Sequence, residues 1–168
     1  VALYTTADPA WQSLPRSDEG LRMAVERVLA ELRKAGYDLM RDVQVLTPMH
    51  KGNAGVAALN DALREQMNPL GRNRLEFETK NAAGARQLWR LGDKVMNRVN
   101  DYSRGVYNGE QGLITRVDPG ARTIDVTYPD LGARHTYNRD DLDNLQTAFA
   151  VTIHKSQGSE YPCVVMVL

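Results

Sequence analysis

The stretch VTIHKSQGSEYPCVV, residues 151–165, consists of two apolar segments separated by a polar turn. The apolar segments predict two buried strands, and the turn between them holds more polar groups than a simple chain reversal requires. Thr152 and His154 fall where the first strand ends, which is the end at which open α/β sheets place their ligands. The stretch therefore predicts an α/β domain with a ligand site at this turn.

The turn gathers hydrogen-bond donors within a few residues. Lys155 and Ser156 supply an ammonium and a hydroxyl, Gln157 follows them, and Gly158 lets backbone amides approach a ligand closely. Such donors without neighbouring acids favour a phosphate, whereas Glu160 is an acceptor suited to a ribose hydroxyl. The alternative is that Lys155 is a solvated surface charge and Glu160 caps the next element. The residues alone leave both readings open.

A second loop, TPMHKGNAG at residues 47–55, has a similar composition. Thr47, His50 and Lys51 precede two glycines at the start of an expected helix. The free amides and the positive dipole end of a helix N-terminus attract anions. The alternative is a plain helix entry in which the glycines serve only the turn. The chain contains no GxxxxGK followed by Ser or Thr, so this is not a Walker loop.

Helices and a strand alternate around this loop. Apolar spacing predicts one helix within residues 17–38 and another within 54–69, and residues 43–46 between them form an expected strand. Helix, strand and helix in this order begin an α/β sandwich with a parallel sheet.

From residue 92 the pattern changes to short alternating segments separated by turn signals. Four or five short strands within about 50 residues favour a small antiparallel barrel. Residues 140–146 form an expected polar helical turn, after which the α/β pattern resumes with a strand at 149–153. The expected domains are 1–91 for the first part of the α/β domain, 92–147 for an inserted barrel and 148–168 for the return to the α/β domain.

Composition limits the class of protein. The chain has 168 residues, of which 42% are hydrophobic and 25% charged, and no apolar run approaches the roughly 20 residues of a membrane helix. With no visible signal peptide, we expect a cytoplasmic protein without membrane contact. Lys and Arg total 21, as do Asp and Glu, so a site for a polyanion must be local.

The single cysteine, Cys163, is expected to be a core residue and not part of a disulfide. The end of the chain within an expected strand predicts a fragment.

Basic and aromatic residues are concentrated between residues 86 and 107. Charge together with aromatic rings suits single-stranded nucleic acid, and a solvated charged face is the alternative. The basic residues are Arg86, Arg90, Lys94, Arg98 and Arg104, the acidic ones are Asp93 and Asp101, and the aromatic ones are Trp89, Tyr102 and Tyr107.

Three segments resemble, in order and spacing, the C-terminal motor region of RecD-like DNA helicases of superfamily 1, the 5′-to-3′ group. VQVLTPMHKGNAGVAALNDALREQMNP (43–69) is similar to the family's motif IV segment, and TIHKSQGSEYPCVV (152–165) is similar to its motif V. GDKVMNRVNDYSRGVYNGEQG (92–112) resembles the entry to its inserted SH3-like domain. The resemblance covers roughly residues 40–168.

The resemblance implies a RecA-like parallel sheet with helices on both faces, carrying a small inserted SH3-like antiparallel β-barrel. In this family two RecA-like domains close around ATP while single-stranded DNA crosses their top. The implied nucleotide-binding residues are Gln157, Gly158 and Glu160. The implied DNA-binding residues are Thr47, His50, Lys51, Arg98, Asn100, Thr152, His154, Lys155 and Ser156.

The resemblance also implies what this chain does not contain. The family's phosphate-binding loop and Mg²⁺-binding acidic motif belong to the first motor domain, and the arginine-bearing motif VI follows motif V. Because phosphoryl transfer needs these groups, we expect this chain alone to be inactive.

The implied parent protein is an enzyme that unwinds DNA with ATP and Mg²⁺ in recombination or repair. Its expected partners are single-stranded DNA, ATP, the missing first RecA-like domain and subunits of a nuclease complex. The alternatives are a non-motor single-stranded-DNA-binding module and the helicase part of a conjugative relaxase.

Overall fold

The computed structural model describes residues 18–48, 55–71, 75–81 and 84–167. The chain divides into two compact units: unit 1 comprises Val1–Met67 and Phe149–Leu168, and unit 2 comprises Asn68–Ala148. Unit 2 is thus inserted into the sequence of unit 1. It begins before residue 92, where the barrel was expected to start.

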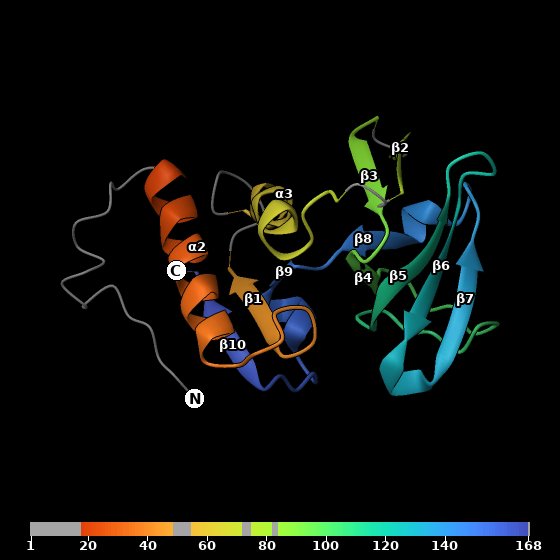
Figure 1. Ribbon diagram of the computed structural model, residues 1–168. Coiled ribbons are helices and arrows are strands. Elements are labelled where there is room, and N and C mark those ends of the chain that lie inside the picture. Colours follow the sequence, from red (N-terminus) through yellow and green to blue (C-terminus); the bar gives the residue numbers. More distant parts are fainter. Residues whose placement is uncertain (1–17, 49–54, 72–74, 82–83, 168) are drawn as a thin grey trace. The chain divides into compact units, whose positions relative to one another are not determined.

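Unit 1 is built on a three-stranded parallel sheet with the order β10-β1-β9. Among its described residues, the other elements are two helices and a short 3-10 turn (Figure 1). The parallel α/β sheet predicted from the sequence is therefore confirmed. In chain order the elements are α2 (Asp18–Lys34), β1 (Val43–Thr47), α3 (Val56–Met67), β9 (Ala150–Thr152), η3 (Ile153–Ser156) and β10 (Cys163–Met166).

The core of unit 1 lies against one face of this sheet. Val43 and Val45, which alternate along β1, join a buried apolar cluster with side chains from both helices. Leu32 of α2 and Leu63 of α3 are fully buried there, and each buried leucine contributes about 1.5–3 kcal/mol of hydrophobic stabilisation. Both described helices thus pack on the same side of β1. The helical layer expected on the second face is not among the described residues.

Unit 2 contains a five-stranded antiparallel sheet with the order β7-β6-β5-β4-β8 and a two-stranded hairpin, β2-β3. Four of its strands follow the alternating segments predicted from the sequence, which confirms an antiparallel β insertion. The hairpin and β8 were not predicted. The elements are β2 (Glu76–Lys80), β3 (Arg86–Arg90), β4 (Lys94–Asn97), β5 (Gln111–Asp118), β6 (Thr123–Tyr128), η1 (Pro129–Leu131), β7 (Ala133–Tyr137), η2 (Leu142–Asn144) and β8 (Leu145–Thr147).

The expected helical turn at 140–146 is shorter in the structure, because only Leu142–Asn144 form a 3-10 turn before β8 begins. Leu145 is buried and pairs with Asn97 of β4, so strand pairing takes over from the turn at this point.

The β5–β6 pairing depends on a close backbone approach at Gly112. A Cβ at this position would lie 2.6 Å from a methyl carbon of Val126 and 2.8 Å from the carbonyl oxygen of Thr127. The hydroxyl groups of Tyr128 at the end of β6 and Tyr137 at the end of β7 lie 2.7 Å apart within the apolar core of unit 2. None of the described helices is long and apolar enough to cross a membrane.

Candidate functional site

The two polar loops singled out from the sequence begin at the same edge of the parallel sheet. Thr47 is the last residue of β1 and Thr152 the last of β9, and the two are register partners. Both are buried. Because parallel strands end at one edge, the segment after Thr47 and the turn after Thr152 start side by side. His50 and Lys51 lie outside the described residues.

The turn after β9 is held by its own hydrogen bonds. Thr152 is the N-cap of η3, and its hydroxyl oxygen accepts a hydrogen bond of 3.3 Å from the backbone N–H of Lys155. The hydroxyl of Ser156 donates to the carbonyl oxygen of Ile153 at 2.8 Å. His154, between these contacts, is exposed. The sequence therefore forms a fixed polar turn that directs an imidazole to the surface.

The chain leaves this turn through an exposed segment. The N–H of Gln157 donates to His154, and that of Ser159 donates to Ser156. Gly158 has a φ of 85°, a left-handed conformation that side chains disfavour, and a Cβ there would meet open space. Glu160 is exposed, and among the described residues it has no hydrogen-bond or ion-pair partner. Its carboxylate is thus available as an acceptor.

Asn60, which the sequence analysis missed, holds α3 to β9. Its side-chain amide donates to the carbonyl oxygen of Ala150 at 2.8 Å and accepts from the N–H of Ala150 at 3.0 Å. Asn60 is buried. These paired bonds fix the strand that carries Thr152. A polar side chain beside the apolar positions Leu59 and Leu63 of the helix is the signal that pointed to it.

The basic and aromatic patch proposed between residues 86 and 107 is largely internal. Trp89 is only 1% exposed, and its ring N–H donates to the hydroxyl of Thr79. Arg90 is buried, and its Nε donates to Glu76 at 2.7 Å. Lys94 is buried as well. Because all three side chains are buried, neither a nucleic-acid platform nor a solvated charged face describes these three residues.

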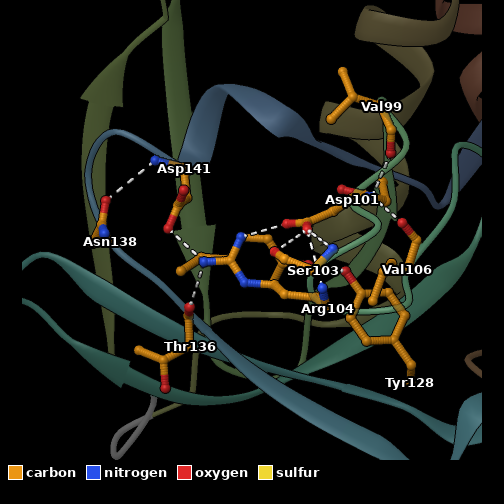
Figure 2. A network of polar contacts seen from close by, with 11 residues as sticks. Val99, Asp101, Ser103, Arg104, Val106, Tyr128, Thr136, Asn138 and Asp141 are labelled. Atoms are coloured by element: carbon orange, nitrogen blue, oxygen red, sulfur yellow. Dashed lines mark hydrogen bonds and ion pairs between the residues drawn. The ribbon is translucent and has the colours of Figure 1, made fainter.

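Arg104, a fourth member of that patch, is neutralised by two carboxylates. Its guanidinium contacts Asp101 at 2.8 Å and Asp141 at 2.8 Å (Figure 2). It also lies 4.8 Å above the ring of Tyr137. These contacts join the β4–β5 loop, residues 98–110, to the segment that follows β7.

Asp101 organises the same loop from within. Its carboxylate accepts hydrogen bonds from the hydroxyl of Ser103 at 2.6 Å and from the N–H groups of Ser103 and Arg104. Its backbone pairs with Val106 across the loop. The hydrogen bond from Ser103, followed by those from Arg104, lowers the pKa of Asp101 to about 2. Asp101 is therefore a structural carboxylate that is ionised at neutral pH.

Arg98 and Asn100, both predicted to contact DNA, lie on this loop and are exposed. The guanidinium of Arg98 donates to the carbonyl oxygen of Asp143 at 3.3 Å. The amide of Asn100 accepts from the N–H of Asn108 at 2.9 Å and reaches the hydroxyl of Tyr102 at 3.4 Å.

Within the described part of the chain, no group of three or more His, Cys, Asp or Glu residues is placed to hold a metal ion.

Two family models match the chain. Residues 59–128 match the SH3 domain of ATP-dependent RecD-like DNA helicases, and residues 147–167 match the UvrD-like helicase C-terminal domain. The first match covers most of unit 2, and the second covers β9, η3 and β10.

Curated relatives agree with these matches. The ATP-dependent RecD2 DNA helicase of Deinococcus radiodurans is 35% identical over 126 residues, which is 75% of this chain and 16% of that protein. The RecD subunit of the RecBCD enzyme of Haemophilus influenzae is 34% identical over 134 residues, which is 75% of this chain and 17% of that protein. The chain thus spans under a fifth of the length of these relatives.

Solved structures show the same fold. A Pif1 helicase from Bacteroides in complex with ADP-AlF3 and single-stranded DNA has a TM-score of 0.50 at 20% identity, covering 98% of this chain and 44% of that one. A structure of Pif1 helicases at forked double-stranded DNA gives a TM-score of 0.53 at 19% identity, covering 98% and 42%. Sequence and fold agree, and the chain belongs to the RecD-like DNA helicases of superfamily 1.

Proposed function

We propose that this chain is the C-terminal motor region of an ATP-dependent 5′-to-3′ DNA helicase. Unit 1 is its second RecA-like domain, and unit 2 is an SH3-like insertion. The observation that carries the proposal is the register of Thr47 with Thr152, since it brings two loops of the resemblance to one edge of a parallel sheet. Ligands of open α/β sheets bind at this edge.

The DNA side of the proposed site is the turn at the end of β9. His154 is exposed, while Lys155 and Ser156 are half-buried beside it. The imidazole of His154 and the ammonium of Lys155 can donate to the phosphates of a single strand, whereas the hydroxyl of Ser156 would first have to release the carbonyl oxygen of Ile153. His50 and Lys51 follow Thr47 in the sequence and are proposed to extend the same contact.

Thr47 and Thr152 are buried at the start of these loops, so direct DNA contact by their hydroxyls stays a prediction. What supports a role for Thr152 is its hydrogen bond to the N–H of Lys155, because that bond orders the turn. In unit 2, Arg98 and Asn100 are proposed as further DNA contacts on an exposed loop.

The nucleotide side is the segment that follows, with Gln157, Gly158 and Glu160. The exposed carboxylate of Glu160 can accept hydrogen bonds from ribose hydroxyls, and the left-handed Gly158 sets the direction of the chain before it. These features fit the ribose of a bound ATP. ATP is the nucleotide that the proposed motor hydrolyses.

The described residues do not fit a Mg²⁺ site, because they contain no cluster of candidate ligands. We therefore assign the Mg²⁺ ligands and the phosphate-binding loop to the first RecA-like domain of the same protein. The matched RecD subunit of the RecBCD enzyme supports the further proposal that the protein works with nuclease-complex subunits in DNA recombination or repair.

A pair of variants in the full-length protein tests this division of labour. Glu160→Ala is expected to weaken nucleotide affinity more than affinity for single-stranded DNA. His154→Ala combined with Lys155→Ala is expected to do the reverse. Equal losses of both affinities in both variants would contradict a turn with separate DNA and nucleotide sides.

A further inference from the structure

The β4–β5 loop exposes apolar side chains that the core of unit 2 does not use. Tyr102 is 77% exposed, Tyr107 is 47% exposed and Val99 is 42% exposed. The two tyrosine rings lie edge to face with their centroids 6.0 Å apart. Single exposed apolar residues are common on protein surfaces and need no explanation, whereas three within one short loop indicate an interaction surface.

The loop is ordered by the polar network of Figure 2. Asp101 binds the turn at Ser103 and Arg104, and Arg104 in turn reaches Asp141 and the carbonyl oxygen of Thr136. This network connects the exposed tip to the segment around β7. The tyrosines are therefore presented by a braced loop.

Each tyrosine also has a local support. The amide of Asn100 lies 3.4 Å from the hydroxyl of Tyr102. The N–H of Tyr107 donates to the carboxylate of Glu110 at 2.6 Å. The first contact restrains the Tyr102 ring and the second fixes the backbone at Tyr107, and such order before binding reduces the entropy lost when a ligand is bound.

The charges around the rings do not favour phosphate. Arg104 is neutralised by Asp101 and Asp141, and Glu110 adds a further carboxylate to the loop. Arg98 is the exposed basic residue of this loop. An ordered pair of rings among balanced charges suits the flat, uncharged face of a nucleobase, because base stacking on aromatic side chains needs no cation.

We propose that Tyr102 and Tyr107 stack against bases of single-stranded DNA, and that Arg104 is a positioning residue that holds their loop. The inference rests on the proposed function and deepens it. The loop would contribute stacking on bases, a contact that differs in kind from the backbone contacts proposed for the turn after β9.

The test compares two oligonucleotides that differ only in their bases. The full-length protein is titrated with labelled oligo-dT and with an abasic oligonucleotide of the same length, followed by fluorescence anisotropy. Tyr102→Ala and Tyr107→Ala are each expected to weaken oligo-dT binding about tenfold. Neither should change abasic binding. Tyr107→Phe should bind as the unmodified protein does, and Tyr102→Phe, which keeps the ring but loses the contact with Asn100, should keep most of the affinity for oligo-dT.

Two further variants serve as control and as positioning test. Leu131→Ala removes another exposed apolar side chain of unit 2, outside the loop, and is expected to leave both affinities unchanged. Arg104→Gln is expected to reproduce the base-dependent loss while keeping the salt dependence of binding. A direct phosphate contact by Arg104 would instead lower the salt slope by about one and weaken abasic binding as well.

The outcomes separate this inference from the proposed function. Unmodified protein that binds both oligonucleotides equally, with no effect of the alanine variants, would overturn base stacking and leave DNA binding in place. Failure to bind oligo-dT at all would overturn the proposed function and the inference with it. Tyrosine variants that bind DNA normally but lose a protein partner would assign the patch to protein recognition and overturn the inference.

Discussion

Thr47 and Thr152 are register partners on the adjacent parallel strands β1 and β9, and each is the last residue of its strand. This relationship connects two polar loops that lie far apart in the sequence. The starts of both loops, which carry the contacts proposed for unit 1, therefore lie at one edge of its sheet.

Asn60 is expected to determine the stability of this edge. Asn60→Ala removes both hydrogen bonds to Ala150 and leaves buried backbone groups without partners, so the free energy of unfolding should fall by about 1–3 kcal/mol. Urea denaturation measures it. The control variant Ala57→Gln, at an exposed position of the same helix, should stay within about 0.5 kcal/mol of the unmodified protein. Equal stability of the two variants would show that Asn60 does not hold β9.

Thr152 is expected to act through the order of the turn. Thr152→Val keeps the shape of the side chain but removes the acceptor for the N–H of Lys155, so stability should fall by about 1 kcal/mol and single-stranded DNA affinity several-fold. Thr152→Ser keeps a hydroxyl and should bind almost normally. Anisotropy titrations of both variants measure the effect. Normal DNA binding by the valine variant would show that the N-cap hydrogen bond of Thr152 is not needed for DNA binding.

Asp101 gives the β4–β5 loop a defined pH dependence. Its pKa is lowered to about 2, chiefly by the hydrogen bond from Ser103, whereas an unfolded chain has an aspartate pKa of about 3.9. A lowered pKa stabilises the folded state above the unfolded value, and this contribution is lost as the pH falls from about 4 through about 2.

Thermal unfolding of Asp101→Asn beside the unmodified protein measures this contribution. The difference in Tm between the variant and the unmodified protein should be about the same at pH 5 and pH 7. It should shrink below about pH 4. Asp140→Asn, at an exposed position near the same segment, serves as the control variant. A difference that stays unchanged down to about pH 2 would contradict the role of the charge.

The strands of both units were predictable where local pattern and burial agree. Val43 and Val45 alternate toward one face, and the strands β5 and β6 are separated by turn residues. The hairpin β2-β3 was missed because Glu76, Glu78 and Lys80 give its first strand, β2, a polar sequence in which Phe77 is the buried residue. Its existence depends on pairing and packing that no local pattern shows.

The residues of the candidate site were likewise predictable only in part. The turn at 152–160 stood out because its polar residues are contiguous in the sequence. The internal role of Arg90 was not predictable, because its partner Glu76 lies in another strand. Likewise Arg104 is a basic residue of the kind that contacts DNA, but its charge is neutralised in part by Asp141, which is distant in the sequence. Charge in a sequence does not reveal which charges the fold pairs.

The most direct test of the central claim is the preference of the protein for single-stranded DNA. Labelled single-stranded and duplex oligonucleotides of equal length are titrated at two salt concentrations and followed by fluorescence anisotropy. The account predicts tighter binding to the single strand, weakening at the higher salt as phosphate contacts are screened, and a loss of this binding in His154→Ala with Lys155→Ala. Equal or tighter binding to the duplex, or a double variant that binds as well as the unmodified protein, would contradict it.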